Sequence, residues 1–191
     1  MLETIVVVLL VSVLASVMVA VVAVILRNAP TTEARVDDSN SYQRLIIRLQ
    51  RDAASTPPNR FVPHTTPALL PAWSCVGISP TLVQMSWSFE GTAYVAGYRL
   101  EADGNGQRIS RYTCSGPDSG SVFPSPKSES VTARLHNATA VPISGGGKVV
   151  GIRILLTLCL RTDNGPDCTQ PAPGPPIAVE ASSRNPAKTL P

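Results

Sequence analysis

The sequence predicts an α+β fold, in which a long N-terminal membrane-spanning helix continues into an amphipathic helix packed on a small antiparallel β-sheet. Three observations predict this class: an apolar run from Ile5 to Leu26, a helical pattern of apolar residues between 42 and 53, and alternating segments joined by glycine-containing turns beyond residue 80. The 18 Pro and 13 Gly among 191 residues also favour strands and turns over a helical bundle.

The apolar run contains no charge between Glu3 and Arg27, and only Ser12 and Ser16 interrupt it. A helix rises about 1.5 Å per residue, so the run would extend roughly 33 Å and could cross a bilayer. It is longer than the apolar stretch of a cleaved signal peptide, and no Lys or Arg precedes it. Because it is apolar all round, one small domain could not cover it. The run therefore predicts a retained single-pass membrane anchor.

Two features of the sequence predict opposite orientations of this anchor in the membrane. The first basic residues, Arg27 and Arg35, follow the run, and the positive-inside rule would then leave the C-terminal part in the cytoplasm. An even number of cysteines in a small, Pro-rich domain favours disulfides in an oxidising exterior instead. We therefore expect the C-terminal domain to be extracytoplasmic at the cell membrane, and a short basic leader before Met1 would remove the conflict.

A second helical pattern follows the apolar run. Apolar residues recur at i, i+3, i+4, i+7 and i+11, and arginines together with Asp52 are placed elsewhere around the cylinder. The apolar stripe consists of Tyr42, Leu45, Ile46, Leu49 and Ala53. Pro30 is expected to bend or interrupt the helix, and Pro57 with Pro58 to end it. The stripe needs a sheet or another helix to cover it.

The sheet is predicted from the middle of the chain. Residues 81–89, 93–102 and 107–114 alternate apolar with polar side chains, and the joints "EGT" and "DGNG" contain hairpin turn residues. This pattern predicts an antiparallel meander. Residues 130–139 and 148–161 are weaker strand candidates, and the second could pair with the meander. The Pro-, Gly- and Ser-rich stretches 115–130 and 170–191 are expected to be loop or tail.

These elements divide the chain into four predicted parts. They are a membrane helix (1–28), an amphipathic helical extension (29–56), an extracytoplasmic antiparallel β domain (57–170) and a Pro-rich C-terminal tail (171–191).

The four cysteines are the candidate disulfide residues, and they are Cys75, Cys114, Cys159 and Cys168. Three connectivities are possible. Cys159 and Cys168 enclose a short segment with turn residues, "LRTDNGPD", and that length suits a hairpin clip. Cys75 would then pair with Cys114 and join the loop before the meander to its third strand.

Several functional classes find little support in the sequence. The net charge is +3, and the 13 Arg and 3 Lys are scattered singly, so no nucleic-acid partner is predicted. His64 and His136 are isolated and no C-x-x-C occurs, so we predict no metal site, no cofactor, no catalytic residues and no enzymatic activity. "SGGGK" at 144–148 lacks the spacing of a phosphate-binding loop and is predicted to be a turn.

The order of these parts resembles the type IV pilin-like proteins, in particular their minor members, the minor pilins and the J-type pseudopilins of type II secretion. The features that carry the resemblance are the glutamate at the start of the apolar helix, the extension ending in "RLIIRLQRDAAS", and the meander segment "YRLEADGNGQRISRY". The family's cleavage motif reads glycine, an aromatic residue or Met, a small polar residue, two apolar residues and glutamate. Here Met1 and Leu2 match the two apolar residues and Glu3 matches the glutamate, so the mature terminus would lie two positions upstream of Met1.

The resemblance implies a function in assembly. The chain would be a structural subunit of a filament like a type IV pilus or a type II secretion pseudopilus, with other pilin-like subunits, the lipid bilayer and a prepilin peptidase as partners. Glu3 would neutralise the N-terminal ammonium of a neighbouring subunit, and a buried carboxylate is much less unfavourable beside such a charge. A residue so near the helix end could also lie at the lipid headgroups. The alternative function is a membrane-anchored extracytoplasmic binding protein that does not polymerise.

Two small residues of the apolar run also have two interpretations. Ser12 and Ser16 lie four residues apart with Ala15 between them, and small residues let helices approach closely. Their hydroxyls could equally bond carbonyls of their own helix.

Overall fold

The computed structural model describes residues 2–63, 73–77, 82–124, 126–132, 134–162 and 165–184. Within the first helix, the side chains described are those of residue 7, residues 11–24 and residues from 39 onward. The chain forms two compact units, Met1–Asn40 and Ser41–Pro191. His64 and the last seven residues lie outside the described residues.

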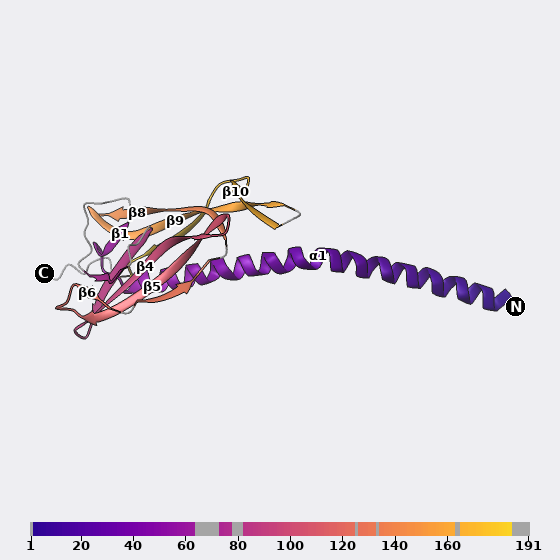
Figure 1. Ribbon diagram of the computed structural model, residues 1–191, viewed down its shortest axis with the longest axis horizontal. Helices are drawn as coiled ribbons and strands as arrows, with labels where there is room; N and C mark the ends of the chain where they lie inside the picture. The colour runs from indigo at the N-terminus through magenta and orange to yellow at the C-terminus, as the bar shows by residue number, and fades with distance from the viewer. Residues whose placement is uncertain are drawn as a thin grey trace. The chain divides into compact units, whose positions relative to one another are not determined.

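Helix α1 runs from Leu2–Ser55 (Figure 1), so the predicted membrane and amphipathic segments belong to one helix. Pro30 was expected to bend or interrupt the helix. The interruption is wrong, because helical backbone continues on both sides of this residue, and the bend stays a prediction. A proline removes one helical hydrogen bond, but the flanking turns keep theirs. The helix ends at Ser55, close to Pro57 and Pro58 as expected, and Thr56 N–H still bonds the carbonyl of Ala53 at 3.1 Å.

The predicted meander is present as β3 (Val83–Phe89), β4 (Thr92–Asp103) and β5 (Gly106–Pro117). All three strands pair in antiparallel order, with Met85 opposite Ala96 and Tyr98 opposite Arg111. The β3–β4 turn places Glu90 and Gly91 at φ of 49° and 74°, the left-handed backbone that two-residue hairpin turns require.

A second antiparallel group is formed by β8 (Leu135–Gly145) and β9 (Lys148–Thr162). Their hairpin turn is Gly146–Gly147, both with positive φ, which confirms "SGGGK" as a turn. The pairing predicted between 148–161 and the meander is not seen in the described residues, because β9 pairs with β8, and β8 reaches β5 through Leu135 opposite Gln107.

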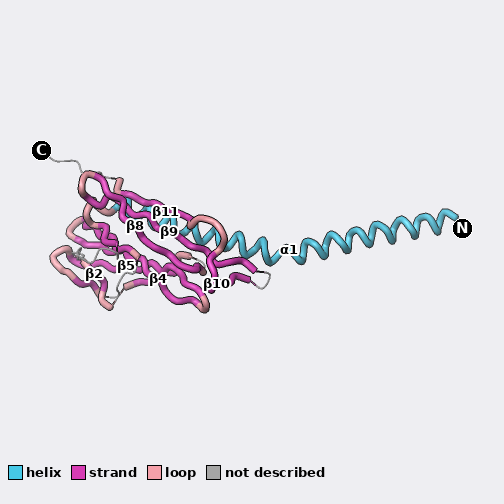
Figure 2. The backbone as a smooth tube through the Cα atoms, turned by 90° about the horizontal axis from the view of Figure 1, so that it is seen from above, coloured by secondary structure: helices cyan, strands magenta, loops and turns pink. Residues whose placement is uncertain are grey.

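The remaining strands lie at the edges of these two groups. They are β1 (Phe61–Pro63) on β3, β7 (Lys127–Ser130) on β5, and β10 (Gly165–Pro171) and β11 (Ile177–Ser182) on β9. The described strands form a nine-stranded antiparallel sheet, beside which β2 (Ser74–Cys75) and β6 (Val122–Phe123) form a two-stranded parallel pair. Figure 2 shows β8, β9 and β11 side by side in the larger sheet.

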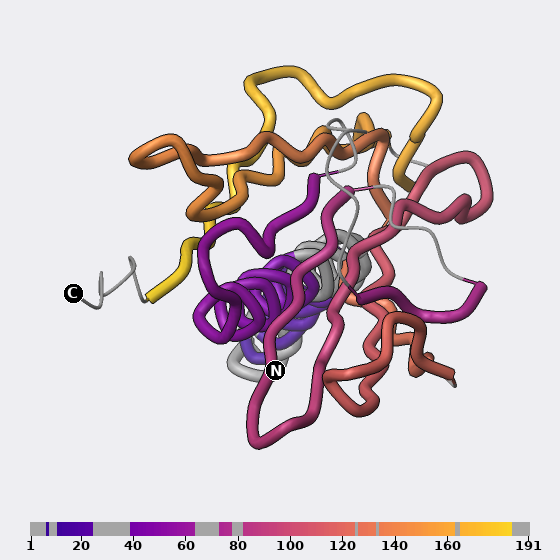
Figure 3. Tube along the Cα trace, turned by 90° about the vertical axis from the view of Figure 1, so that its left-hand side faces the viewer, coloured from indigo at the N-terminus to yellow at the C-terminus, as the bar shows by residue number. Residues whose placement is uncertain are grey.

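The main core lies between the sheet and the C-terminal part of α1. Viewed along the helix axis, this helical segment lies among the strands, with β11 (yellow) on one side and the meander on the other (Figure 3). Leu45, Leu49 and Ala53 are fully buried against Phe61, Met85 and residues of β8, β9 and β11, and Tyr42 and Ile46 are half-buried. The predicted apolar stripe of the helix is therefore confirmed.

The predicted fold class is wrong. The described part of the chain contains eleven strands and one helix, so the fold is mostly β and its sheet is large. No helix among the described residues is long and apolar enough to cross a membrane. The sheet was underestimated because β6, β7 and β11 lie in Pro- and Ser-rich segments that resemble loop or tail by composition, and edge strands tolerate such residues.

Candidate functional site

An uncovered apolar surface surrounds residues 11–24 of α1, here called the apolar sleeve. All 14 residues are exposed, although only Ser12 and Ser16 among them are polar. The large apolar side chains of the sleeve are between 52% and 71% exposed, and they are Val11, Val13, Leu14, Val17, Met18, Val19, Val21, Val22 and Val24. Monomeric proteins rarely leave contiguous patches of this kind in water, so the sleeve indicates an interaction surface.

The hydroxyl of Ser16 donates a hydrogen bond to the carbonyl of Val13 at 2.8 Å. The polar group is thus satisfied within its own helix, as one of the two interpretations of these serines expected. The bonded hydroxyl of Ser16 therefore leaves the sleeve mainly apolar. A neighbouring surface would meet mainly Val, Leu, Met and Ala side chains there.

Glu3, the predicted assembly residue, belongs to the helical backbone of α1. Its side chain lies outside the described residues, so the role assigned to it stays a prediction.

A buried polar network joins α1 to the meander, and sequence reasoning missed it. Asp52 is 3% exposed, and its two carboxylate oxygens accept bonds from Nε and Nη2 of Arg111 at 2.7 and 2.8 Å. The hydroxyl of Tyr98 donates to Oδ2 of the same carboxylate at 2.8 Å. Two-pronged contacts of this kind fix geometry as well as charge. The network therefore sets how the helix lies on β4 and β5.

The sequence did contain a signal for this network. The prediction that Asp52 lies away from the apolar stripe is wrong, because Asp52 is buried. It follows Leu49 by three residues, and this spacing puts it on the same side of the helix as Leu45 and Leu49. A buried carboxylate requires a partner, and Arg111 with Tyr98 supply it. The pattern could thus have predicted a buried ion pair, although not which of the 13 arginines would form it.

Burial raises the pKa of the Tyr98 hydroxyl well above its ordinary value, and the charge of Asp52 raises it further. Burial acts to lower the pKa of Arg111, but the hydrogen bonds to Asp52 and the attraction of its charge together outweigh burial and raise this pKa above its ordinary value. Tyr98 consequently stays protonated as a donor and Arg111 stays charged. The network therefore joins the charged Arg111 and the hydroxyl of Tyr98 to the helix.

A second ion pair joins the helix to the sheet one turn earlier. Arg48 Nη2 contacts Glu129 Oε1 of β7 at 3.0 Å, with side chains 38% and 41% exposed. Pairs this exposed contribute little because water screens them. The Arg48–Glu129 pair therefore serves as an exposed control for the buried Asp52–Arg111 pair.

The structure contains two disulfides, Cys75–Cys114 and Cys159–Cys168, which is the pairing that the spacing favoured. The first joins β2 to β5 and belongs to a second buried cluster with Val95, Tyr112 and Phe123. The second closes the end of the β9–β10 hairpin. Such bridges form and persist in oxidising compartments.

No group of three or more metal-ligating side chains occurs among the described residues. His136 lies on β8, where its Nδ1 donates to the carbonyl of Cys168 at 2.9 Å. Its position is that of a structural side chain between β8 and β10.

Comparisons with models of protein families, with curated proteins and with solved structures found no match to this chain. The candidate function therefore depends on the sleeve, the disulfide-bonded sheet and the sequence resemblance alone.

Proposed function

We propose that this chain is a structural subunit of a filament, of the minor pilin or pseudopilin kind, and that copies or related subunits associate through its N-terminal helix. The observation that carries the proposal is the apolar sleeve, in which every residue from 11 to 24 is exposed. Covering a large apolar side chain contributes about 1.5–3 kcal/mol, so burying the half-exposed side chains of the sleeve would contribute on the order of 10 kcal/mol.

The second unit supports the proposal by its construction. Its two disulfides suit a domain outside the cytoplasm, and its core covers the C-terminal turns of α1 with the sheet. One end of the chain thus offers a helix to neighbours, and the other is a self-contained, cross-linked domain. We place this domain outside the cytoplasm, on the surface of the filament.

Glu3 has a specific task within this proposal. Its carboxylate would pair with the N-terminal ammonium of a neighbouring subunit in the helical interior of the filament, where an unpaired charge is strongly unfavourable. The prediction rests on the sequence position of Glu3 beside the apolar run. The cognate processing enzyme would be a prepilin peptidase acting upstream of Glu3.

The proposal is tested by following the full chain, with an epitope tag at its C-terminus, into filaments sheared from the surface of its own host. We expect the tag in the filament fraction by immunoblotting and on filaments by immunogold labelling. Replacing Glu3→Ala should reduce incorporation, with Glu3→Asp as the control that keeps the charge. A tag confined to the cell fraction as a monomer would support a binding protein that does not polymerise, and unchanged incorporation of Glu3→Ala would remove the role given to Glu3.

A further inference from the structure

Strand β11 has one edge that no described strand covers. It pairs with β9 on one side, from Ile177 opposite Leu156 to Ser182 opposite Gly151, and with no described strand on the other. Open edges can pair with further chains, and proteins usually protect them. Glu180 supplies a charge at this edge, but the six-residue strand contains no proline.

The register identifies the backbone groups that this edge exposes. Ser183 N–H bonds the carbonyl of Val150 at 2.8 Å, in line with the β11–β9 register. Because bonded pairs alternate along an antiparallel ladder, Ala181 and Val179 also direct their backbone groups toward β9. The N–H and C=O groups of Ala178, Glu180 and Ser182 consequently point away from β9.

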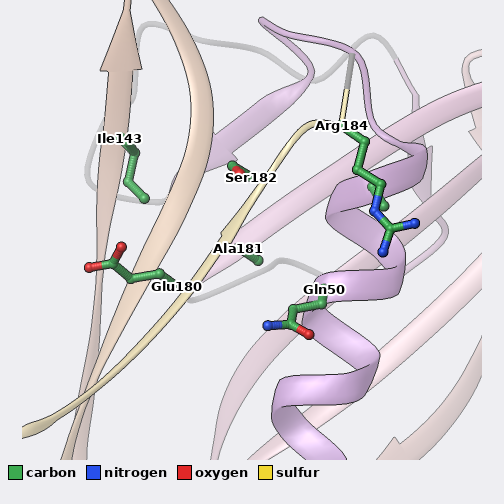
Figure 4. A pocket seen from close by; sticks show the side chains of 7 residues that line it. Gln50, Ile143, Glu180, Ala181, Ser182 and Arg184 are labelled. Carbon is green, nitrogen blue, oxygen red and sulfur yellow. The ribbon is translucent and has the colours of Figure 1, made fainter. Parts of the chain in front are cut away.

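A cavity of about 320 Å³ lies along this edge (Figure 4). The cavity is lined by Glu180, Ala181 and Ser182 of β11, by Gln50 and Ala54 of α1, by Arg184, and by Ile143 of β8. Figure 4 shows Gln50 on the helix across from the strand, and Arg184 directly after the strand with its guanidinium extended toward the helix. The space therefore has a strand edge on one wall and a polar helix side chain on the other.

The charges around the cavity are unbalanced. Glu180 is neutralised by Arg153, whose Nε contacts its carboxylate at 2.5 Å. Arg184 has no ion-pair partner among the described residues, and the side chain of Gln50 has no hydrogen-bond partner among them. A carboxylate entering the cavity would meet a positive charge and an amide that can donate.

We propose that the outer edge of β11 docks an extended peptide segment that carries a carboxylate side chain. The segment adds as a strand along Ala178, Glu180 and Ser182, in the space between β11 and α1, and its carboxylate pairs with Arg184. Backbone bonds supply affinity, as in other cases of strand addition, and here the charge of Arg184 supplies selectivity. At about 3.3 Å per residue, some five residues of the partner cover this edge. The docking site is independent of filament assembly.

The experiment uses the purified full chain and a fluorescein-labelled probe peptide of alternating Thr, Val and Glu, read by fluorescence anisotropy. Two control peptides separate backbone from charge. One is N-methylated at alternate residues and cannot donate along the edge, and the other has Lys in place of Glu. We expect saturable binding of the probe, and binding at least about tenfold weaker for both controls, because each loses more than one favourable contact.

Variants of the chain locate the binding at β11. Ala178→Pro removes an outward N–H but no bond to β9, and Ala178→Thr keeps that N–H and is the matched control. We expect about fivefold weaker binding for Ala178→Pro, unchanged binding for Ala178→Thr, and a loss of selectivity between the Glu and Lys peptides in Arg184→Gln. Circular dichroism and the unfolding midpoint show that each variant is folded.

Three results would overturn the proposal. They are equal binding of the probe and its N-methylated form, unchanged binding by folded Ala178→Pro, and concentration-dependent self-association that Ala178→Pro abolishes while no peptide binds. The last result would identify a second copy of this chain as the occupant of the edge.

Discussion

Arg111 on β5 donates two hydrogen bonds, at 2.7 and 2.8 Å, to the carboxylate of Asp52 on α1, and Asp52 is buried. The two residues are 59 positions apart in the chain, so their contact exists only when the helix lies on the meander. Removing one partner would leave a buried charge unpaired, which is more costly than losing the contact itself.

Replacing Arg111→Met should therefore lower the free energy of unfolding by about 3–5 kcal/mol. Arg48→Met is the matched control, because Arg48 pairs with Glu129 near the surface and its loss should cost less than about 1 kcal/mol. Denaturant unfolding of the full chain, followed by circular dichroism, measures both. Equal losses in the two variants would show that Asp52 is not held in a buried pair.

Tyr98 and Tyr112 are both buried, but only the hydroxyl of Tyr98 has a hydrogen-bond partner among the described residues, so replacement by Phe should destabilise the protein only at Tyr98. Tyr98→Phe removes the bond to Asp52 and should destabilise by about 1.5–3 kcal/mol. The hydroxyl of Tyr112 has no partner among the described residues, so Tyr112→Phe should leave stability unchanged or raise it by up to about 1 kcal/mol. Thermal unfolding of the two variants against the parent chain decides this, and a large loss in Tyr112→Phe would reveal a partner for its hydroxyl.

The same tyrosines predict loss of stability at alkaline pH. Burial raises the pKa of both hydroxyls above the ordinary value of 10.0. Below pH 10 the folded and unfolded chains hold these protons equally, and above it the unfolded chain releases them first, so the free energy of unfolding falls as pH rises. Unfolding measured from about pH 8 to 11 should show this fall, and Tyr112→Phe should make it shallower. An unchanged slope in that variant would contradict the raised pKa of Tyr112.

The two disulfides should contribute unequally, because they close loops of different length. The bridges span 39 residues for Cys75–Cys114 and 9 for Cys159–Cys168, which corresponds to about 4 and about 2.5 kcal/mol in the chain-entropy description. Paired Cys→Ser variants, compared by denaturant unfolding under oxidising conditions, test the order. Peptide mapping by mass spectrometry should find only these two links, and a Cys75–Cys159 link would contradict the structure.

The sequence predicted those parts of the fold that follow a regular period. The stripe containing Leu45 and Leu49, the three strands of the meander and the favoured cysteine pairing are all present in the structure. In each case the signal was local: a period of about 3.6 residues for the helix, a period of two residues for the strands, and a short loop between two cysteines.

The features that the sequence did not predict depend mainly on contacts between residues far apart in the chain. Strand β11 forms because Val179 and Ala181 are buried on the main core once β9 is in place, and nothing in its Pro-rich surroundings indicates this. The helix continues through Pro30 because one missing hydrogen bond leaves the flanking helical turns able to form theirs. The Asp52–Arg111 pair needed knowledge of which strand would lie under the helix.

Association through the apolar sleeve is the central claim, and two matched substitutions test it most directly. Val17 in the sleeve and Val122 on β6 are each 55% exposed. A glutamate at position 17 would be buried between helices in a filament, whereas one at position 122 would stay in water on the disulfide-bonded domain.

The measurement is the amount of tagged chain recovered in sheared filaments from hosts that carry either variant in place of the native copy. We expect Val17→Glu to lower incorporation by at least about tenfold and Val122→Glu to leave it within about twofold of the parent chain, at equal cellular levels. Equal incorporation of Val17→Glu and the parent chain would contradict assembly through this helix.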